Sequence, residues 1–140
     1  MPAKNKIKEY LEKGFYHVYN RGVEKRIIFT DKQDYSVFLG YLKEYLNPKD
    51  TLGLTQTITN PTSSALDKAE AARALRLNNF TDEIDLIAYC LMPNHFHLLV
   101  KQNDARSIVT FMRSLCTRYV QYFNKRHEKR VGGLFQDTYK

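Results

Sequence analysis

Two histidines separated by a single residue, His95 and His97, are the side chains with the clearest capacity for chemistry in this sequence. Residues two apart in a β-strand face the same way, so both imidazoles are predicted to project from one face of a sheet. Two neutral imidazoles form a partial ligand set for Mg²⁺, Mn²⁺ or Zn²⁺, which a third side chain and water would complete. Histidines in a strand are also ordinary surface or interior residues. The apolar residues around this pair favour the ligand role, because enclosed imidazoles need polar partners.

A second group of candidate residues lies in a predicted turn closer to the N-terminus. Asn20, Arg21, Lys25 and Arg26 surround Gly22, and a glycine permits a sharp turn or a close approach to a ligand. The basic side chains could neutralise phosphates, and the alternative is a solvated turn. A net charge of +7, from 22 Lys and Arg against 15 Asp and Glu, favours a polyanionic partner such as nucleic acid. We therefore interpret this turn as a DNA-binding segment.

The other histidines and the cysteines have simpler interpretations. His17 is predicted on the same sheet face as the histidine pair, where it could contact metal or DNA or be an ordinary hydrogen-bonded strand residue. His127, in a helix end rich in Lys and Arg, is expected to be solvated. Cys90 and Cys116 lie in apolar segments without C-x-x-C spacing, which predicts buried free thiols in a reducing compartment. With no secretory signal in the sequence, we expect a cytoplasmic protein.

The N-terminal elements that would position these residues are a strand and a helix. Residues 14–20 alternate as a strand whose Phe15, His17 and Tyr19 share one side, and residues 27–29 could add a hairpin arm. Thr30 is the predicted N-cap of the helix that follows, with Gln33 at capping-box spacing. Its apolar stripe predicts the face that packs on the sheet. The stripe comprises Tyr35, Phe38, Leu39, Leu42 and Leu46, and the helix is predicted to end at 47–48.

The C-terminal half predicts a hairpin, a long helix and a short edge strand. Residues 47–82 are interpreted as a loop insertion with a short helix at 66–77. Residues 84–91, apolar on both sides, are predicted as a central strand, followed by a turn at 92–94 and a return strand at 95–101. Asp104 is the predicted N-cap of a helix over 105–126, and 134–136 would form the edge strand. The buried helix stripe is predicted to be Ile108, Met112, Leu115, Tyr119 and Tyr122. The fold class is α+β, an antiparallel sheet with two helices on one face, as in ferredoxin-like and RRM-like folds.

Residues 91–99, Leu-Met-Pro-Asn-His-Phe-His-Leu-Leu, closely resemble the histidine–hydrophobe–histidine (HUH) motif of single-tyrosine transposases. The nearest resemblance is to the REP-associated tyrosine transposases and their insertion-sequence relatives. Further blocks at 17–22, 29–39, 119–124 and 133–140 resemble the same family in the same order. The resemblance therefore covers nearly the whole sequence except 47–82, and indicates a single transposase-like core over 1–140.

The resemblance implies a DNA transposase that cuts single-stranded DNA. A tyrosine would attack a backbone phosphate, forming a 5′-phosphotyrosine link and freeing a 3′-hydroxyl, so that a second strand could be joined without a nucleotide cofactor. A divalent ion, Mg²⁺ or Mn²⁺, held by His95 and His97 would polarise the phosphate oxygens. The expected partners are single-stranded or hairpin DNA and, in a possible homodimer, a second copy of the chain.

The tyrosine nucleophile of this family lies on a helix after the segment that resembles 133–140. We therefore expect the nucleophile and a third metal ligand beyond residue 140, and expect residues 1–140 to be an inactive core, truncated or naturally short. Tyr119 and Tyr122 are predicted to pack behind the sheet, away from the histidines. Tyr139 matches a family tyrosine that is not the nucleophile.

Two other functions fit parts of the pattern. A non-catalytic single-stranded nucleic-acid binder with an RRM-like sheet would explain the basic charge and the strand aromatics, but would leave the paired histidines without a task. A histidine-dependent phosphoesterase of the histidine-triad kind would need a third alternating histidine, and position 99 is leucine. We rank this last.

Overall fold

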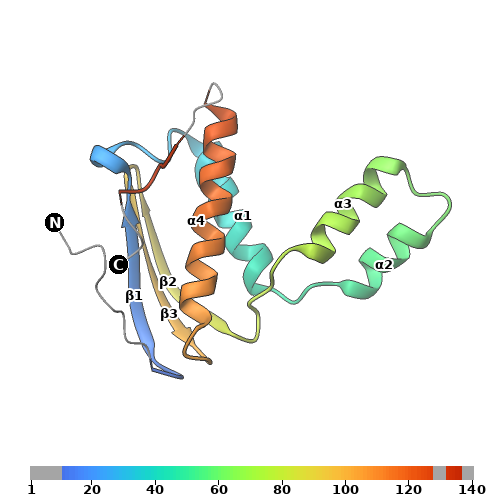
Figure 1. The fold of residues 1–140 in the computed structure, drawn as a ribbon, viewed down its shortest axis with the longest axis horizontal. Coiled ribbons are helices and arrows are strands. Elements are labelled where there is room, and N and C mark those ends of the chain that lie inside the picture. The colour runs from blue at the N-terminus through green and yellow to red at the C-terminus, as the bar shows by residue number, and fades with distance from the viewer. Residues whose placement is uncertain (1–10, 128–131, 137–140) are drawn as a thin grey trace.

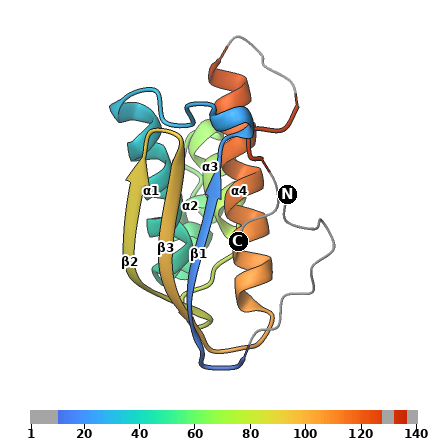
Figure 2. The same ribbon diagram turned by 90° about the vertical axis from the view of Figure 1, so that its left-hand side faces the viewer.

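A three-stranded antiparallel sheet forms one layer of the protein, and helices α1 and α4 cover one of its faces (Figures 1 and 2). The computed structural model describes residues 11–127 and 132–136. Along the chain the elements are β1 (Phe15–Arg21), the 3-10 turn η1 (Val23–Lys25), α1 (Lys32–Leu46), α2 (Thr51–Thr59), α3 (Ala65–Arg76), β2 (Ile84–Met92), β3 (His95–Gln102) and α4 (Ser107–Arg126). The α+β class and the two helices on one face were correctly predicted.

Strand β3 lies in the centre of the sheet and divides its side chains cleanly between the two faces. Phe96, Leu98 and Val100 are fully buried beneath the helices. They pack with α1 and α4 residues that include Phe38 and Tyr119. The alternation of the strand therefore directs His95, His97 and the other odd-numbered β3 residues toward the opposite face, which we call the open face.

Strand β2 is an edge strand, which corrects its prediction as the central strand of the sheet. The strand order is β1-β3-β2, with β2 and β1 both antiparallel to β3. A register shift between Leu86 and Ala88 interrupts the β2 ladder. Ile87 within the shift and Tyr89 after it are both about half exposed. An apolar run without strict alternation can thus belong to a bulged edge strand as well as to a central one.

The segment before α1 is a loop rather than the predicted hairpin arm at 27–29. The N–H groups of Ile28 and Phe29 both donate to the carbonyl oxygen of Pro93, at 2.8 and 3.0 Å, instead of forming a strand ladder. The helix N-cap is Asp31, not Thr30, because the Asp31 carboxylate accepts from the backbone N–H of Asp34. The prediction placed the cap one residue too early.

Residues 51–76 form a helical hairpin, which corrects the prediction of a loop in the first half of 47–82. Asp50 caps α2 by accepting from Gly53 N–H, and Ser64 caps α3 by accepting from Asp67 N–H. The hairpin projects from the helix layer on the side away from the open face (Figure 1). At its base the Lys49 ammonium donates to two α3-end carbonyls, those of Leu75 and Leu77.

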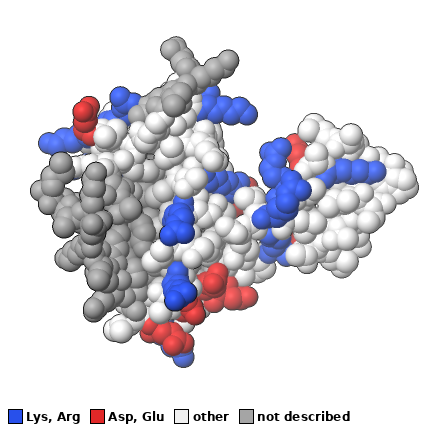
Figure 3. All heavy atoms as spheres, viewed as in Figure 1, with Lys and Arg blue, Asp and Glu red and all other residues white. Residues whose placement is uncertain are grey.

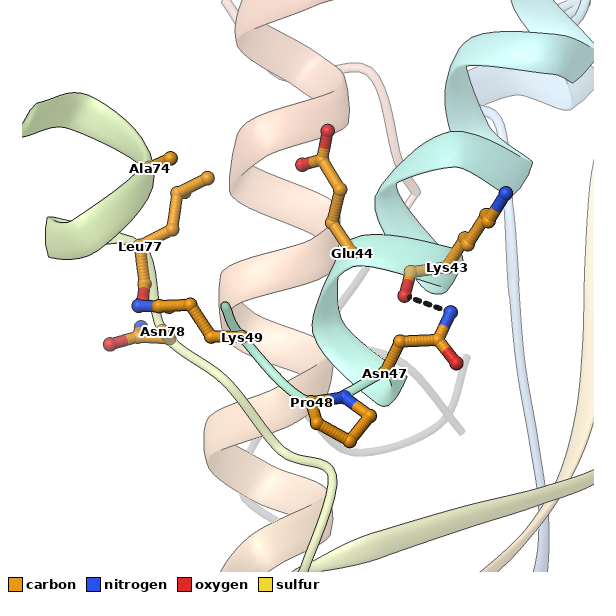
Figure 4. A pocket seen from close by; sticks show the side chains of 8 residues that line it. All are labelled: Lys43, Glu44, Asn47, Pro48, Lys49, Ala74, Leu77 and Asn78. Atoms are coloured by element: carbon orange, nitrogen blue, oxygen red, sulfur yellow. Dashed lines mark hydrogen bonds between the residues drawn. The ribbon is translucent and has the colours of Figure 1, made fainter. Parts of the chain in front are cut away.

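A pocket of about 330 Å³ lies where the hairpin leaves the helix layer (Figure 4). The C-terminal ends of α1 and α3 form it, and its lining residues are Lys43, Glu44, Asn47, Pro48, Lys49, Ala74, Leu77 and Asn78. Within the pocket wall the Asn47 amide donates to the Lys43 carbonyl at 2.8 Å. The pocket is thus on the helix side of the sheet and not beside the histidines.

Helix α4 begins later than predicted, and four of the five residues predicted for its buried stripe are buried. Asp104 accepts from Arg106 N–H but does not cap the helix, whose first residue is Ser107. The buried side chains are Ile108, Phe111, Met112, Leu115, Tyr119 and Phe123, whereas Tyr122 is only half-buried. Among the described residues, no helix is long and apolar enough to cross a membrane.

The segment after α4 contributes a single β-bridge instead of the predicted edge strand at 134–136. Phe135 bridges to Gly22 in antiparallel fashion. On either side of the bridge, Val23 N–H donates to Leu134 and Gln136 N–H donates to Arg21, each at 2.8 Å. Leu134 is fully buried, so this short contact anchors the segment next to the end of β1.

Candidate metal centre and nucleic-acid interface

The turn that precedes the two histidines is held in place by the loop between β1 and α1. Pro93 accepts the two N–H groups of Ile28 and Phe29, and Asn94 accepts from Gly22 N–H at 2.9 Å. Gly22 is required by space, because a Cβ atom at this position would lie 2.1 Å from the backbone oxygen of Arg26. The backbone around the β2–β3 turn is therefore fixed before any ligand binds.

His95 and His97 lie side by side on the open face, as the strand alternation predicted. Their ring centroids are 5.0 Å apart and their planes are almost perpendicular, at 89°. The sheet register pairs His95 with Arg21 and Met92, the last residues of β1 and β2. Burial and the neighbouring imidazoles of His17 and His95 lower the pKa of His97. This shift favours the neutral form of His97, which is the form that metal coordination requires.

His17, from β1, touches the pair directly. Its Nε2 atom lies 2.8 Å from Nδ1 of His97, and the two ring planes are within 20° of parallel. One of the interpretations of His17 from the sequence was a hydrogen-bonded strand residue on this face. The structure supplies the partner, the imidazole of His97, from a residue 80 positions away.

Tyr19 is the residue on the open face that sequence reasoning missed. Its ring centroid is 5.5 Å from that of His97 and 5.5 Å from that of His17. Two positions before His17 on β1, Phe15 is 64% exposed, and the Lys101 ammonium lies 5.6 Å from its ring centroid. The alternation of β1 contained this signal, since it assigned Phe15, His17 and Tyr19 to one side. The open face therefore combines imidazoles, exposed aromatic rings and a cation.

The donor set fits a divalent ion in part. His95 and His97 offer two imidazole nitrogens on an accessible surface, and first-row divalent metals accept such ligands together with oxygen ligands. Among the residues that the structure describes, no group of three or more His, Cys, Asp or Glu side chains is arranged to hold a metal. Any ion held by the pair would therefore need water or substrate oxygens to complete its coordination.

The four residues predicted to bind DNA do not all face solvent. Arg21, Lys25 and Arg26 are exposed, but Asn20 is 6% exposed and its side chain lies on the helix side of the sheet. Arg21 donates through its guanidinium to the Gln136 side-chain oxygen at 2.8 and 3.0 Å. The basic side chains thus cluster at the end of β1 closest to His95, while Asn20 is structural.

The tyrosines of α4 lie behind the sheet, as predicted. Tyr119 is fully buried, donates to the Ile28 carbonyl, and has a pKa raised far above its usual range, chiefly by burial. The Tyr122 hydroxyl donates to Asp34 at 2.8 Å, and burial together with this bond also raises its pKa. Neither hydroxyl is available as a nucleophile on the open face.

Two simpler predictions need correction. His127 is not merely solvated: its ring packs on Phe123 with centroids 4.1 Å apart, and its Nε2 atom is 3.5 Å from the Asp34 carboxylate. Cys90 is exposed instead of buried, because β2 is an edge strand, and it pairs with His97 in the sheet register. Cys116 is half-buried. Both thiols are free, as predicted. Tyr139 lies outside the described residues.

Comparison with known proteins gives one finding. The family model described as "Transposase IS200 like" matches residues 64–140, a range that includes α3, the β2–β3 hairpin with the two histidines, and α4. No curated protein and no solved structure matches the chain.

Basic side chains are also spread over the helix side of the molecule and line both sides of the hollow between the α2–α3 hairpin and the helix layer (Figure 3).

Proposed function

The chain belongs to the family of IS200-like transposases, which are DNA-transposing enzymes, and we propose that it binds single-stranded DNA across its open face. There it would cleave and rejoin the strand by metal-assisted attack of a tyrosine on a backbone phosphate. One observation carries this proposal: the rings of His95 and His97 lie together on the open face of β3, directly after a turn whose backbone is held by hydrogen bonds.

His95 and His97 would hold the divalent ion, Mg²⁺ or Mn²⁺. When bound, such an ion stabilises the negative charge that develops on phosphate oxygens during transesterification. The protein contributes the hydrogen-bonded turn and a His97 whose lowered pKa favours the neutral, metal-binding form. Because only two protein ligands are described, we expect weak affinity in the absence of DNA.

The DNA path is proposed to run from Arg21 and Arg26, beside the histidines, along β1 to Phe15. The guanidinium groups would neutralise phosphates, and the exposed rings of Tyr19 and Phe15 would stack on unpaired bases. Lys25 adds a third exposed cation at the same end of the sheet. Asn20 is left out of this path because it is buried.

The nucleophilic tyrosine is proposed to lie beyond residue 140, on the segment that continues from Gln136. Gln136 is hydrogen-bonded through its side chain to Arg21, the strand partner of His95. A segment that continues from Gln136 therefore starts beside the histidine pair. The buried or hydrogen-bonded hydroxyls of Tyr119 and Tyr122 support this choice.

The metal part of the proposal is tested by calorimetric titration with Mn²⁺. The double variant His95→Ala/His97→Ala should abolish binding, while His127→Ala, which alters a histidine at the C-terminal end of α4 on the helix side of the sheet, should leave it unchanged. Equal binding in the double variant and the unaltered protein would refute the assignment of the metal site.

The second candidate function, a non-catalytic binder of single strands, is favoured by the exposed aromatic rings of Phe15 and Tyr19 on the sheet. The two functions separate in one comparison. A chain that binds a single-stranded oligonucleotide with unchanged affinity with and without Mn²⁺, and that binds no Mn²⁺ itself, would be a binding module.

A further inference from the structure

His95 and His97 each have a side-chain hydrogen-bond partner at Nδ1, which is Asn94 for His95 and His17 for His97. We propose that Asn94 and His17 are positioning residues that select the tautomers of His95 and His97 in which Nε2 is free to bind a metal. The inference rests on the proposed metal site and assigns a task to two residues outside the ligand pair.

The tautomer of His95 follows from the orientation of Asn94. The Asn94 amide nitrogen is directed at the Lys25 carbonyl, 3.5 Å away, and its side-chain oxygen lies 2.7 Å from Nδ1 of His95. An amide oxygen can only accept a hydrogen bond, so Nδ1 of His95 must carry the proton. A neutral imidazole has one N–H, and the lone pair of His95 is therefore on Nε2.

The contact between His17 and His97 allows two proton arrangements. Either Nδ1 of His97 donates to Nε2 of His17, or the donor and acceptor are exchanged. Only the first leaves the lone pair of His97 on Nε2. In the proposed arrangement, Nε2 of His17 accepts the hydrogen bond from the Nδ1–H of His97 whether or not a metal is bound.

The chemistry of these partners has a consequence for affinity. Metal-bound histidines usually donate their second N–H to a carboxylate, a carbonyl oxygen or water, and a carboxylate makes the imidazole a stronger ligand. Here an amide oxygen and an imidazole take that place, and neither is a carboxylate. These partners therefore orient the two ligand imidazoles without making them stronger metal ligands. Replacing Asn94 with a carboxylate should tighten metal binding.

The first test reads the tautomers without metal. Nitrogen-15 NMR of the imidazole rings at mildly alkaline pH, where they are neutral, distinguishes N–H from lone-pair nitrogens. His95 should be protonated at Nδ1 in the unaltered protein and in Asn94→Asp, and should become a mixture in Asn94→Ala. His97 should also be protonated at Nδ1 in the unaltered protein. It should become a mixture of the two tautomers in His17→Phe, which keeps a ring but removes the acceptor, and should return to Nδ1 protonation in His17→Gln.

The second test reads Mn²⁺ affinity by calorimetry in the same variants, with circular dichroism showing that each is folded. Asn94→Ala and His17→Phe should each weaken binding about tenfold to a hundredfold. Asn94→Asp should bind Mn²⁺ more tightly than the unaltered protein, and His17→Gln should recover most of the affinity lost in His17→Phe.

The outcomes distinguish the positioning roles from the proposed function. If Mn²⁺ binding depends on His95 and His97 but is unchanged in Asn94→Ala and His17→Phe, the positioning proposal is wrong and the metal site stands. A proton on Nε2 of His95 in the unaltered protein also overturns it. If the tautomers are as expected but no Mn²⁺ binds, the proposed function fails, and the metal-directed role of the two contacts fails with it.

Discussion

Asp34→Ala should destabilise the protein more than most single changes, because this carboxylate is the centre of a buried polar cluster between α1 and α4. Asp34 is fully buried. It accepts hydrogen bonds from the Thr30 backbone N–H at 2.9 Å, the Thr30 hydroxyl at 2.6 Å, the Tyr122 hydroxyl at 2.8 Å and the Arg126 guanidinium at 2.6 Å. The substitution leaves all of these donors without their acceptor.

The expected loss in the free energy of unfolding is about 3–5 kcal/mol, the usual cost of removing one partner from a buried ion pair. The individual bonds to a charged acceptor are worth about 1.5–3 kcal/mol each, but they share one group and do not add. Arg126 keeps a second partner in Asp31, at 2.6 Å, which favours the lower part of the range. The measurement is urea unfolding at neutral pH, with Glu70→Ala, an exposed carboxylate on α3, as the control expected to change stability by less than about 0.5 kcal/mol.

The same comparison should depend on pH in a defined direction. Burial, the largest single influence, raises the pKa of Asp34, but the hydrogen bonds from Thr30, Arg126 and Tyr122 together outweigh it and hold the pKa below the usual value. A carboxyl with a lowered folded-state pKa contributes stability that is complete above the unfolded-state pKa, about 4, and is lost as pH falls through the folded-state value. The difference between the unaltered protein and Asp34→Ala should therefore be constant near neutrality and shrink in acid below about pH 4.

A loss below about 1 kcal/mol, comparable with a surface substitution, would contradict the buried cluster. A difference that stays constant down to the lowest pH at which the protein folds would contradict the pKa argument alone. Asp34→Asn separates the two ideas, because it keeps the shape and one acceptor oxygen but removes the charge.

Three further outcomes are expected. Gly22→Ala should cost about 1–3 kcal/mol of unfolding free energy in urea, because its Cβ would meet the Arg26 carbonyl, and an unchanged midpoint would refute that clash. Arg21→Ala/Arg26→Ala should flatten the slope of log K against log salt concentration for single-stranded DNA binding by about 1.4, since each lost phosphate contact changes it by about 0.7. The control Arg73→Ala, on the α2–α3 hairpin, should leave the slope unchanged. Equal slopes in the double variant and the unaltered protein would place the DNA path elsewhere. Incubated with labelled single-stranded DNA and Mn²⁺, residues 1–140 should give no covalent adduct on a denaturing gel, and a band abolished by Tyr19→Phe would instead make Tyr19 the nucleophile.

The faces of the strands were predictable because strand alternation is a local property. Phe96 and Leu98 are buried beneath the helices and His95 and His97 lie on the open face, as a period of two requires. The same reasoning correctly placed Tyr119 behind the sheet, since its helical spacing from Leu115 puts both on one apolar stripe.

Elements that depend on a distant partner could not be predicted in this way. Ile28 and Phe29 have the composition of a strand, but their N–H groups are bound by the carbonyl of Pro93, which no local pattern indicates. Helix α2, rich in threonine, was interpreted as a loop because its propensity is low. It is stabilised by the Asp50 cap and by packing against α3. In both cases a tertiary contact decides the conformation.

The composition of the site depends on the pairing register of β1 against β3, which aligns Tyr19 with His97 and Val18 with Leu98. A slip of one residue would turn His17 and Tyr19 toward the helices and bring Val18 to the open face. Val18 is only 2% exposed, so its burial in the core opposes that slip. The hydrophobic core thus fixes which β1 side chains reach the histidines. His17 was predictable as a residue of this face, but its contact with Nδ1 of His97 required knowledge of the register.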